Sequence, residues 1–136
     1  MASYYLKLYL LTIPVFFAID LLWLGLVARD FYQKSLAHLL SPNVNWPAAF
    51  FFYGLYIVGI LLFAVKPALD GQALSKAIIW GGLFGFFTYA TYDLTNLATL
   101  RDWPLKVVVV DVIWGTVLCA SVAAASYMIG RWLGSA

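Results

Sequence analysis

Residues Tyr4–Val27 have the sequence YYLKLYLLTIPVFFAIDLLWLGLV, an apolar stretch interrupted by one lysine and one aspartate. A helix needs about 20 such residues to cross the hydrocarbon core of a bilayer. Unpaired backbone amides and carbonyls are costly in lipid, so a segment that crosses it must be helical. This stretch therefore predicts a membrane-spanning helix.

Three further stretches of this kind follow: Pro47–Val65, Leu74–Leu97 and Pro104–Ile129. Two of them are preceded by the sequences Asn45-Trp46-Pro47 and Asp102-Trp103-Pro104. Asparagine or aspartate just before a proline is typical of a helix start. We therefore predict an all-α membrane protein, with residues 1–136 in one domain. Its four transmembrane helices form an antiparallel bundle with both termini on one side.

A longer connection joins the first two stretches. Its first part, Ala28–Leu40, mixes Arg29, Lys34 and His38 with phenylalanine and leucine. Such a mixture is typical of a short amphipathic segment on the membrane surface. The segment could equally act as a lid over the bundle.

The composition excludes several classes of protein. Of 136 residues, 65% are hydrophobic and 10% are charged, whereas about 25% are charged in an average soluble domain. The net charge is only +2, and no basic run could follow a nucleic-acid backbone. The single cysteine, Cys119, cannot form an intrachain disulfide. The expected surroundings are a lipid bilayer.

Three aspartates, Asp20, Asp93 and Asp111, lie inside the predicted spans. Asp20 lies seven residues before Val27, Asp93 lies four residues before Leu97, and Asp111 lies seven residues after Pro104. The first and third helices end where the fourth begins. All three carboxyl groups should therefore lie roughly 10 Å below one membrane surface. Tyr53 of the second helix falls at the same depth.

Helical periodicity supports an interior location. Tyrosines, threonines and an asparagine of the third helix recur on one face, which would not favour lipid. Trp23 follows Asp20 by three residues, and Trp114 follows Asp111 by three. We predict a polar binding layer of nine residues, without assigned catalytic roles: Asp20, Trp23, Tyr53, Tyr89, Tyr92, Asp93, Asn96, Asp111 and Trp114.

Small residues predict the helix contacts. Gly81 and Gly85 are four residues apart in the third helix, and Gly115 lies in the fourth. Such residues let helices approach closely in lipid. The fourth helix has more small residues than one contact needs, so a homo-oligomer is a further expectation.

Several roles are open to the polar layer. Intramembrane acids are rare and usually functional, so we favour a proton- or cation-binding site or a catalytic acid over hydrogen bonding between helices. A Mg²⁺, Mn²⁺ or Ca²⁺ site at Asp20, Asp93 and Asp111 is the least favoured alternative, since no histidine or cysteine adds to it. No cofactor is predicted.

The chain resembles a known family. The resemblance rests on IDLLWLG (Ile19–Gly25), YATYDLTNLATL (Tyr89–Leu100), Trp103-Pro104 and DVIWGT (Asp111–Thr116). These sequences are similar to small bacterial four-helix membrane proteins that form domain-of-unknown-function family 2177. The resemblance implies a multi-pass protein of the bacterial inner membrane, and it carries no activity.

Three functions compete. A small transporter or channel-like protein for a cation, proton or small amine ranks first, because buried acids with aromatic neighbours suit such a ligand. A membrane-embedded enzyme acting on a lipid or lipid-soluble substrate ranks second. A non-catalytic subunit of a membrane complex ranks third.

Overall fold

The computed structural model describes residues 2–135, which contain helices and no strand. Two short π-helical turns, η1 and η2, interrupt or extend the longer helices. In chain order the elements are α1 (Ala2–Leu22), η1 (Trp23–Val27), α2 (Arg29–Ser35), α3 (Trp46–Ile60), η2 (Leu61–Val65), α4 (Lys66–Asp70), α5 (Leu74–Thr99) and α6 (Leu105–Ser135).

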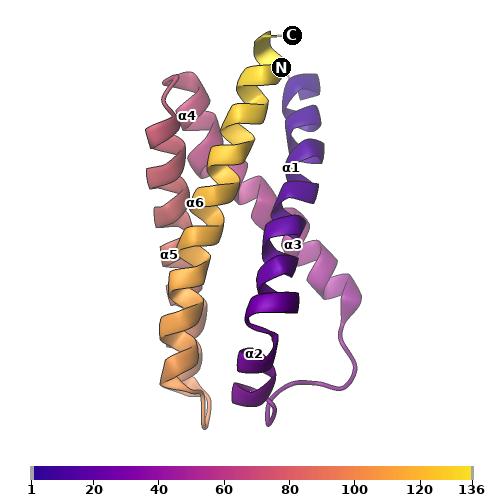
Figure 1. Ribbon diagram of the computed structural model, residues 1–136, viewed down its shortest axis with the longest axis vertical. Helices are drawn as coiled ribbons and strands as arrows, with labels where there is room; N and C mark the ends of the chain where they lie inside the picture. The colour runs from indigo at the N-terminus through magenta and orange to yellow at the C-terminus, as the bar shows by residue number, and fades with distance from the viewer. Residues whose placement is uncertain (1, 136) are drawn as a thin grey trace.

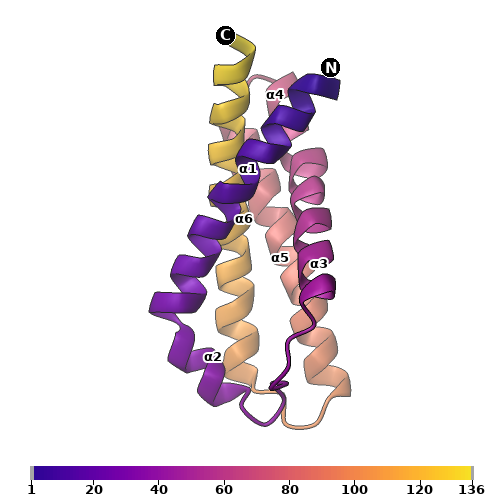
Figure 2. The same cartoon turned by 90° about the vertical axis from the view of Figure 1, so that its right-hand side faces the viewer.

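The long helices run roughly along one axis of the molecule (Figure 1). Helix α6 lies between α1 and α5 and runs in the opposite direction to both. Helix α3 crosses obliquely behind α1, and η2 packs on α5. Helix α1 begins and α6 ends at the same end of the molecule, while α2 lies at the other end (Figure 2).

Both π-helical turns contain a backbone bond to the fifth residue back. The amide of Ala28 donates to the carbonyl of Trp23 (2.7 Å), and the amide of Lys66 donates to that of Leu61. Such turns are rare and widen the helix locally. The η1 turn begins at Trp23, one of the predicted site residues, so it sets the direction in which this indole points.

The end of the second predicted span is a correction. The sequence predicted a span that ends at Val65, whereas the helical segment continues through η2 and α4 to Asp70. Proline lacks an amide proton and clashes inside a regular helix, but it fits the first turn of a new one. Pro67 occupies that position in α4, directly after the π-helical turn.

The two predicted helix starts differ. The Asn45 side chain accepts a hydrogen bond from the Ala48 amide (3.2 Å), so its capping role is confirmed. Asp102 instead lies three residues before α6 in a left-handed conformation (φ 57°), which aspartate tolerates. Its carbonyl accepts a hydrogen bond from His38 Nε2 (2.9 Å), which ties the α2–α3 connection to the α5–α6 turn.

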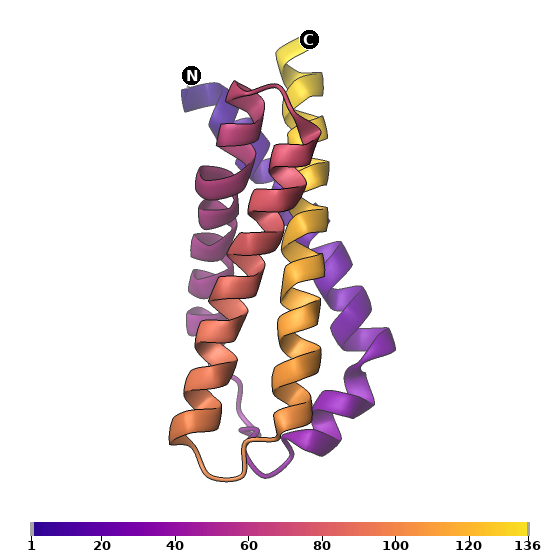
Figure 3. The ribbon, with the colours of Figure 1, turned by 90° about the vertical axis from the view of Figure 1, so that its left-hand side faces the viewer.

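The predicted glycine contacts are confirmed where α5 and α6 run side by side (Figure 3). A Cβ atom at Gly81 would lie 2.7 Å from the Cys119 carbonyl oxygen. A Cβ atom at Gly85 would collide with the Gly115 carbonyl, and one at Gly115 would collide with the Tyr89 ring. The two backbones therefore touch, as small residues allow in helix pairs within lipid.

Three helical segments are long and apolar enough to cross a membrane: Ala2–Val27, Trp46–Asp70 and Leu105–Gly134. Large apolar side chains are exposed along their outer faces, as lipid would require. Helix α5 has sufficient length, with 26 residues. The glycines, threonines, tyrosines and aspartate in it lower its hydropathy, and α5 as a fourth span stays a prediction.

Candidate functional site

Asp93 and Asp111 bring two carboxyl groups together between α5 and α6. Asp93 has no exposed surface, and neither of its oxygens accepts a hydrogen bond from an N–H or hydroxyl group of the described residues. The group that reaches it is the Asp111 carboxyl. Two carboxyl groups can share a hydrogen bond only when one carries a proton, and two ionised ones would repel. The pair is therefore suited to hold a proton or another positive charge.

Asp20 joins this pair from α1. It is 5% exposed and accepts a hydrogen bond from Trp114 Nε1 at 3.3 Å. Asp111 and the Tyr53 hydroxyl also lie close enough to interact with it. The Trp114 ring stacks on Trp23 with centroids 4.5 Å apart and planes 9° apart. The three predicted acids therefore form one interior cluster, with an indole pair beside it.

Tyr32 of α2 covers this cluster from the loop end of the molecule. Its hydroxyl donates to Asp111 Oδ1 (2.9 Å) and accepts from Trp23 Nε1 (3.3 Å). Burial raises the pKa of the Tyr32 hydroxyl above its ordinary value, and the Asp111 carboxylate raises it further. The hydroxyl therefore stays protonated and remains a donor. The surface segment is helical from Arg29 to Ser35, as expected, and it supplies a polar contact to the site.

The other predicted residues of α5 lie at the edge of the cluster. Tyr89 packs over Gly115. Tyr92 is 57% exposed, and its ring meets Trp103 edge-on at 5.9 Å. Asn96 is half-buried one turn further along and interacts with Tyr92. Tyr92 and Asn96 thus lie farther out than the interior layer in which they were predicted.

A cavity of about 420 Å³ opens beside the acid cluster, where the first half of α3 diverges from α5. It is lined by Phe52, Tyr56, Thr88, Tyr89, Tyr92 and Asp111. The Tyr56 hydroxyl is fixed by contacts to Thr88 Oγ1 (2.7 Å) and Cys119 Sγ (3.0 Å). Ligand pockets typically measure about 300–1,000 Å³ and combine apolar walls with a few polar groups. The size and chemistry of this cavity fit a small ligand.

The metal alternative finds no support in the geometry. Among residues 2–135, no group of three or more histidine, cysteine or acidic side chains is arranged to hold a metal ion. Asp20 already accepts an indole N–H and Asp111 accepts a phenol O–H. Each of these donors occupies one carboxylate oxygen, Oδ1 of Asp20 and Oδ1 of Asp111.

The nine predicted residues omit four residues of this site: Tyr32, Phe52, Tyr56 and Thr88. Thr88 is one of the threonines on the polar face of the third predicted helix, so its signal was available. Tyr56 follows Tyr53 by three residues and so shares its helix face, a signal that was available. Phe52 is 50% exposed and resembles the lipid-facing phenylalanines beside it. Tyr32 lies in a different element, and only the folded chain brings it to Asp111.

Comparison with known proteins gives three findings. The chain is 24% identical over 110 residues to a fluoride-specific ion channel, FluC, from Magnetococcus marinus, a match that covers 79% of this chain and 89% of the channel. No solved structure matches. Residues 5–128 match the family described as "Predicted membrane protein (DUF2177)", which was expected from the resemblance. The match covers most of the sequence, and the chain therefore belongs to this family of predicted membrane proteins.

Proposed function

We propose that this protein is a small channel-like transport protein that binds a proton or small cation at the Asp93–Asp111 pair. The observation that carries the proposal is the burial of Asp93 against a second carboxyl group, with no N–H or hydroxyl donor on either Asp93 oxygen among the described residues. Such a pair is unfavourable in a merely structural role, because buried carboxyl groups need partners. A bound positive charge would provide one.

The proposal includes a membrane arrangement. Helix α5 is the fourth span, so that the four long segments alternate in direction and both termini face one side of a bacterial inner membrane. This places the polar cluster within the bilayer and near the surface covered by α2. A homo-oligomer would supply further walls for a pathway, since four helices alone enclose little space.

The charge of the cavity supports a cationic ligand. Asp111 is the one ionisable acid that lines it, and no lysine, arginine or histidine is among its lining residues. An anion would meet a carboxylate without a compensating positive group. The similarity to a fluoride-specific channel is in keeping with a transport role. The acid cluster favours a cation over fluoride as the permeating species.

The test is a flux measurement on purified protein in lipid vesicles that contain a pH-sensitive dye. A potassium diffusion potential drives protons inward, and the parent protein should acidify the lumen faster than protein-free vesicles. Asp93→Asn, which removes the charge and keeps the shape, should reduce the rate to that of protein-free vesicles. Asp30→Asn is the matched control, because Asp30 is exposed on α2 and lies outside the cluster.

Two results would overturn the proposal. One is a proton or cation flux that is the same for the parent and for Asp93→Asn. The other is a flux of fluoride alone, measured with a fluoride-selective electrode on the same vesicles. The second result would favour the activity named for the similar channel.

A membrane-embedded enzyme is the second candidate, and the cavity favours it. Four of the six lining residues are aromatic, which suits an apolar substrate beside the Asp111 carboxyl group. This candidate predicts that extracted lipid is chemically changed by the parent protein and unchanged by Asp111→Asn. If the parent protein also leaves the lipid unchanged, the enzyme candidate is wrong.

A further inference from the structure

We propose that the cavity between α3, α5 and α6 binds a small organic ammonium ion, such as a quaternary amine. The inference rests on the proposed transport function and names its ligand class. It follows from two features of the cavity: rings that stand on several sides, and a carboxylate with a second, buried carboxyl group behind it.

The rings form walls at different angles. Phe52 and Tyr56 lie nearly parallel, with centroids 5.4 Å apart and planes 29° apart. Tyr89 stands at 65° to Tyr56 with a centroid distance of 6.3 Å. Rings set at an angle surround a ligand on more than one side, which is how aromatic cages hold alkylated ammonium groups. A flat apolar groove would not need this arrangement.

The carboxyl groups provide the charge. Asp111 lines the cavity, and the wholly buried Asp93 lies beside Asp111. The Tyr32 hydroxyl already donates to one oxygen of Asp111, at 2.9 Å. An organic ammonium ion can offset the remaining negative charge of Asp111. It does not need the several oxygen ligands that a metal ion requires from its site.

Size and hydration separate the candidate ligands. A cavity of about 420 Å³ is large for a bare alkali-metal ion and lies in the range of small-molecule sites. Aromatic faces attract weakly hydrated organic cations, since little water has to be removed. A lipid tail would fit the rings as well, but it would leave the carboxylate at the cavity wall without a partner.

The experiment is a titration of the purified protein, in detergent at fixed ionic strength, with choline chloride and with its uncharged isostere 3,3-dimethyl-1-butanol. Isothermal titration calorimetry reports both. We expect saturable choline binding at one site and little or no binding of the alcohol. Equal binding of the two compounds would overturn the proposal, because it would show an apolar site that ignores charge. Absence of choline binding would overturn it as well.

Two variants locate the site. Phe52→Leu removes one wall, and Phe51→Leu is its matched control, since Phe51 is the neighbouring residue on α3 and is not among the lining residues. Loss of one cation–π wall should weaken choline binding about 3- to 30-fold. Phe51→Leu should leave it unchanged. Asp111→Asn should abolish it, and equal affinity in Phe52→Leu and the parent would place the ligand elsewhere.

The two proposals fail separately. If choline does not bind while the proton flux still depends on Asp93, the ligand class is wrong and the transport function stands. If choline binds as expected but Asp93→Asn leaves every flux unchanged, the protein holds an ammonium ion without moving protons at this pair, which overturns the proposed function.

Discussion

Among the described residues, Asp93 is unusual because its carboxyl group is buried without a hydrogen-bond donor. Buried polar atoms usually have hydrogen-bond partners, yet both Asp93 oxygens lack an N–H or hydroxyl donor. Trp103 Nε1 is also buried without a partner among the described residues. Asp20 and Asp111, by contrast, each accept a hydrogen bond from an aromatic side chain. This difference is the basis of the proposal that Asp93 binds a ligand.

Asp93→Asn should therefore stabilise the protein while removing its transport activity. An asparagine amide can donate a hydrogen bond to Asp111, which the native carboxylate cannot do. We expect the free energy of unfolding to rise by about 1 kcal/mol. Thermal unfolding in detergent, followed by circular dichroism, measures the change. A lower melting temperature than that of the parent would mean that Asp93 stabilises the fold.

Tyr32→Phe should release α2 from the bundle. The variant keeps the ring and loses the hydroxyl that bonds Asp111 and Trp23. A hydrogen bond to a charged group contributes about 1.5–3 kcal/mol, and a seven-residue helix has little stability of its own. Hydrogen exchange should accelerate in Arg29–Ser35 and stay unchanged in α5 and α6.

The control for this variant is Tyr5→Phe in α1, because no hydrogen bond of the Tyr5 hydroxyl occurs among the described residues. Exchange in α2 should match that of the parent. Unchanged exchange in Tyr32→Phe would show that α2 is held by its apolar contacts with Trp103, Val107 and Val108 alone.

At the scale of elements, the sequence predicted most of what hydropathy and caps determine. The Asn45 cap, the helical surface segment and the glycine contacts of α5 with α6 are confirmed. The π-helical turns could not be predicted. Their sequences, WLGLV and LLFAV, resemble any apolar helix, and the bond to the fifth residue back depends on how the helix packs. The continuation of the second span past Pro67 was missed for the same reason, because the π-helical turn η2 precedes α4.

The same limit applies to the site. Equal depth in four helices predicted that Asp20, Asp93 and Asp111 would meet, because depth follows directly from residue count. Rotation about each helix axis is less certain from sequence, and a π-helical turn changes it. Tyr92 lies in the regular helix α5 and is more exposed than expected. Tyr32 reaches the cluster from α2, an element whose docking no sequence pattern predicted.

Gly85→Ala should destabilise the contact of α5 with α6. The added Cβ would collide with the Gly115 backbone carbonyl, which cannot move without separating the helices. Overpacking of this kind typically costs about 1–3 kcal/mol. Thermal unfolding in detergent measures it.

Gly82→Ala, three residues earlier in the same helix, is the matched control. Its Cβ would meet Thr116 Cγ2 at 3.7 Å, an ordinary contact. Alanine also favours a helix over glycine by roughly 0.8–1 kcal/mol, so this variant should equal or exceed the parent in stability. Equal loss in both variants would show that the helices do not touch at Gly85.

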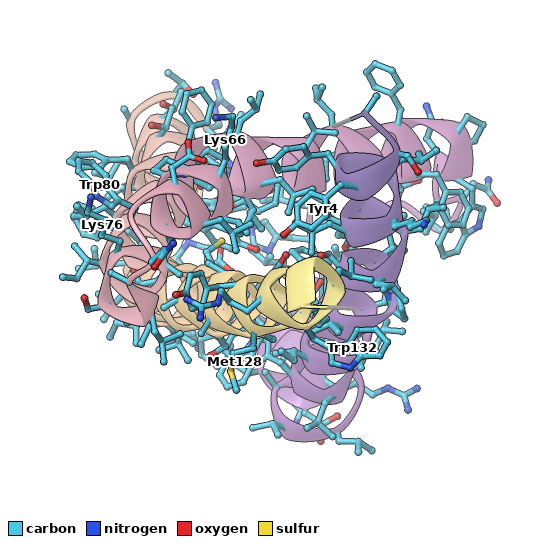
Figure 4. The ribbon with its side chains drawn as sticks, turned by 90° about the horizontal axis from the view of Figure 1, so that it is seen from above. Tyr4, Lys66, Lys76, Trp80, Met128 and Trp132 are labelled. Carbon is cyan, nitrogen blue, oxygen red and sulfur yellow. The ribbon has the colours of Figure 1, made fainter. Side chains whose placement is uncertain are left out.

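At the scale of the whole molecule, the polar cluster and the termini lie at opposite ends. Between them the interior is mostly apolar, with Phe16, Leu118 and Val122 almost fully buried. The buried Thr12 and Ser126 hydroxyls hydrogen-bond to each other there, at 2.8 Å. The other end is closed by side chains such as Tyr4, whose hydroxyl donates to the Gly130 carbonyl at 2.6 Å (Figure 4). The cluster is therefore closer to the surface covered by α2. A complete pathway requires these helices to move apart or a second copy of the chain to contribute.

The number of spans decides whether this geometry can serve transport, and α5 is the segment in question. If α5 crosses the bilayer, Ser75 in its first turn and Arg101 after its end face opposite sides. Ser41 between α2 and α3 then faces the same side as Arg101. All three residues are exposed and accept a cysteine without a packing change, and the native Cys119 is buried.

The single variants Ser75→Cys, Arg101→Cys and Ser41→Cys are expressed in cells, and the intact cells are treated with a membrane-impermeant maleimide. Either Ser75→Cys alone should be labelled, or Arg101→Cys and Ser41→Cys should be labelled and Ser75→Cys should not. Cells opened before labelling supply the control that each thiol can react. Equal labelling of Ser75→Cys and Arg101→Cys in intact cells would leave α5 on one side of the membrane. The acid cluster would then lie at the surface, and the transport proposal would fail with the four-span arrangement.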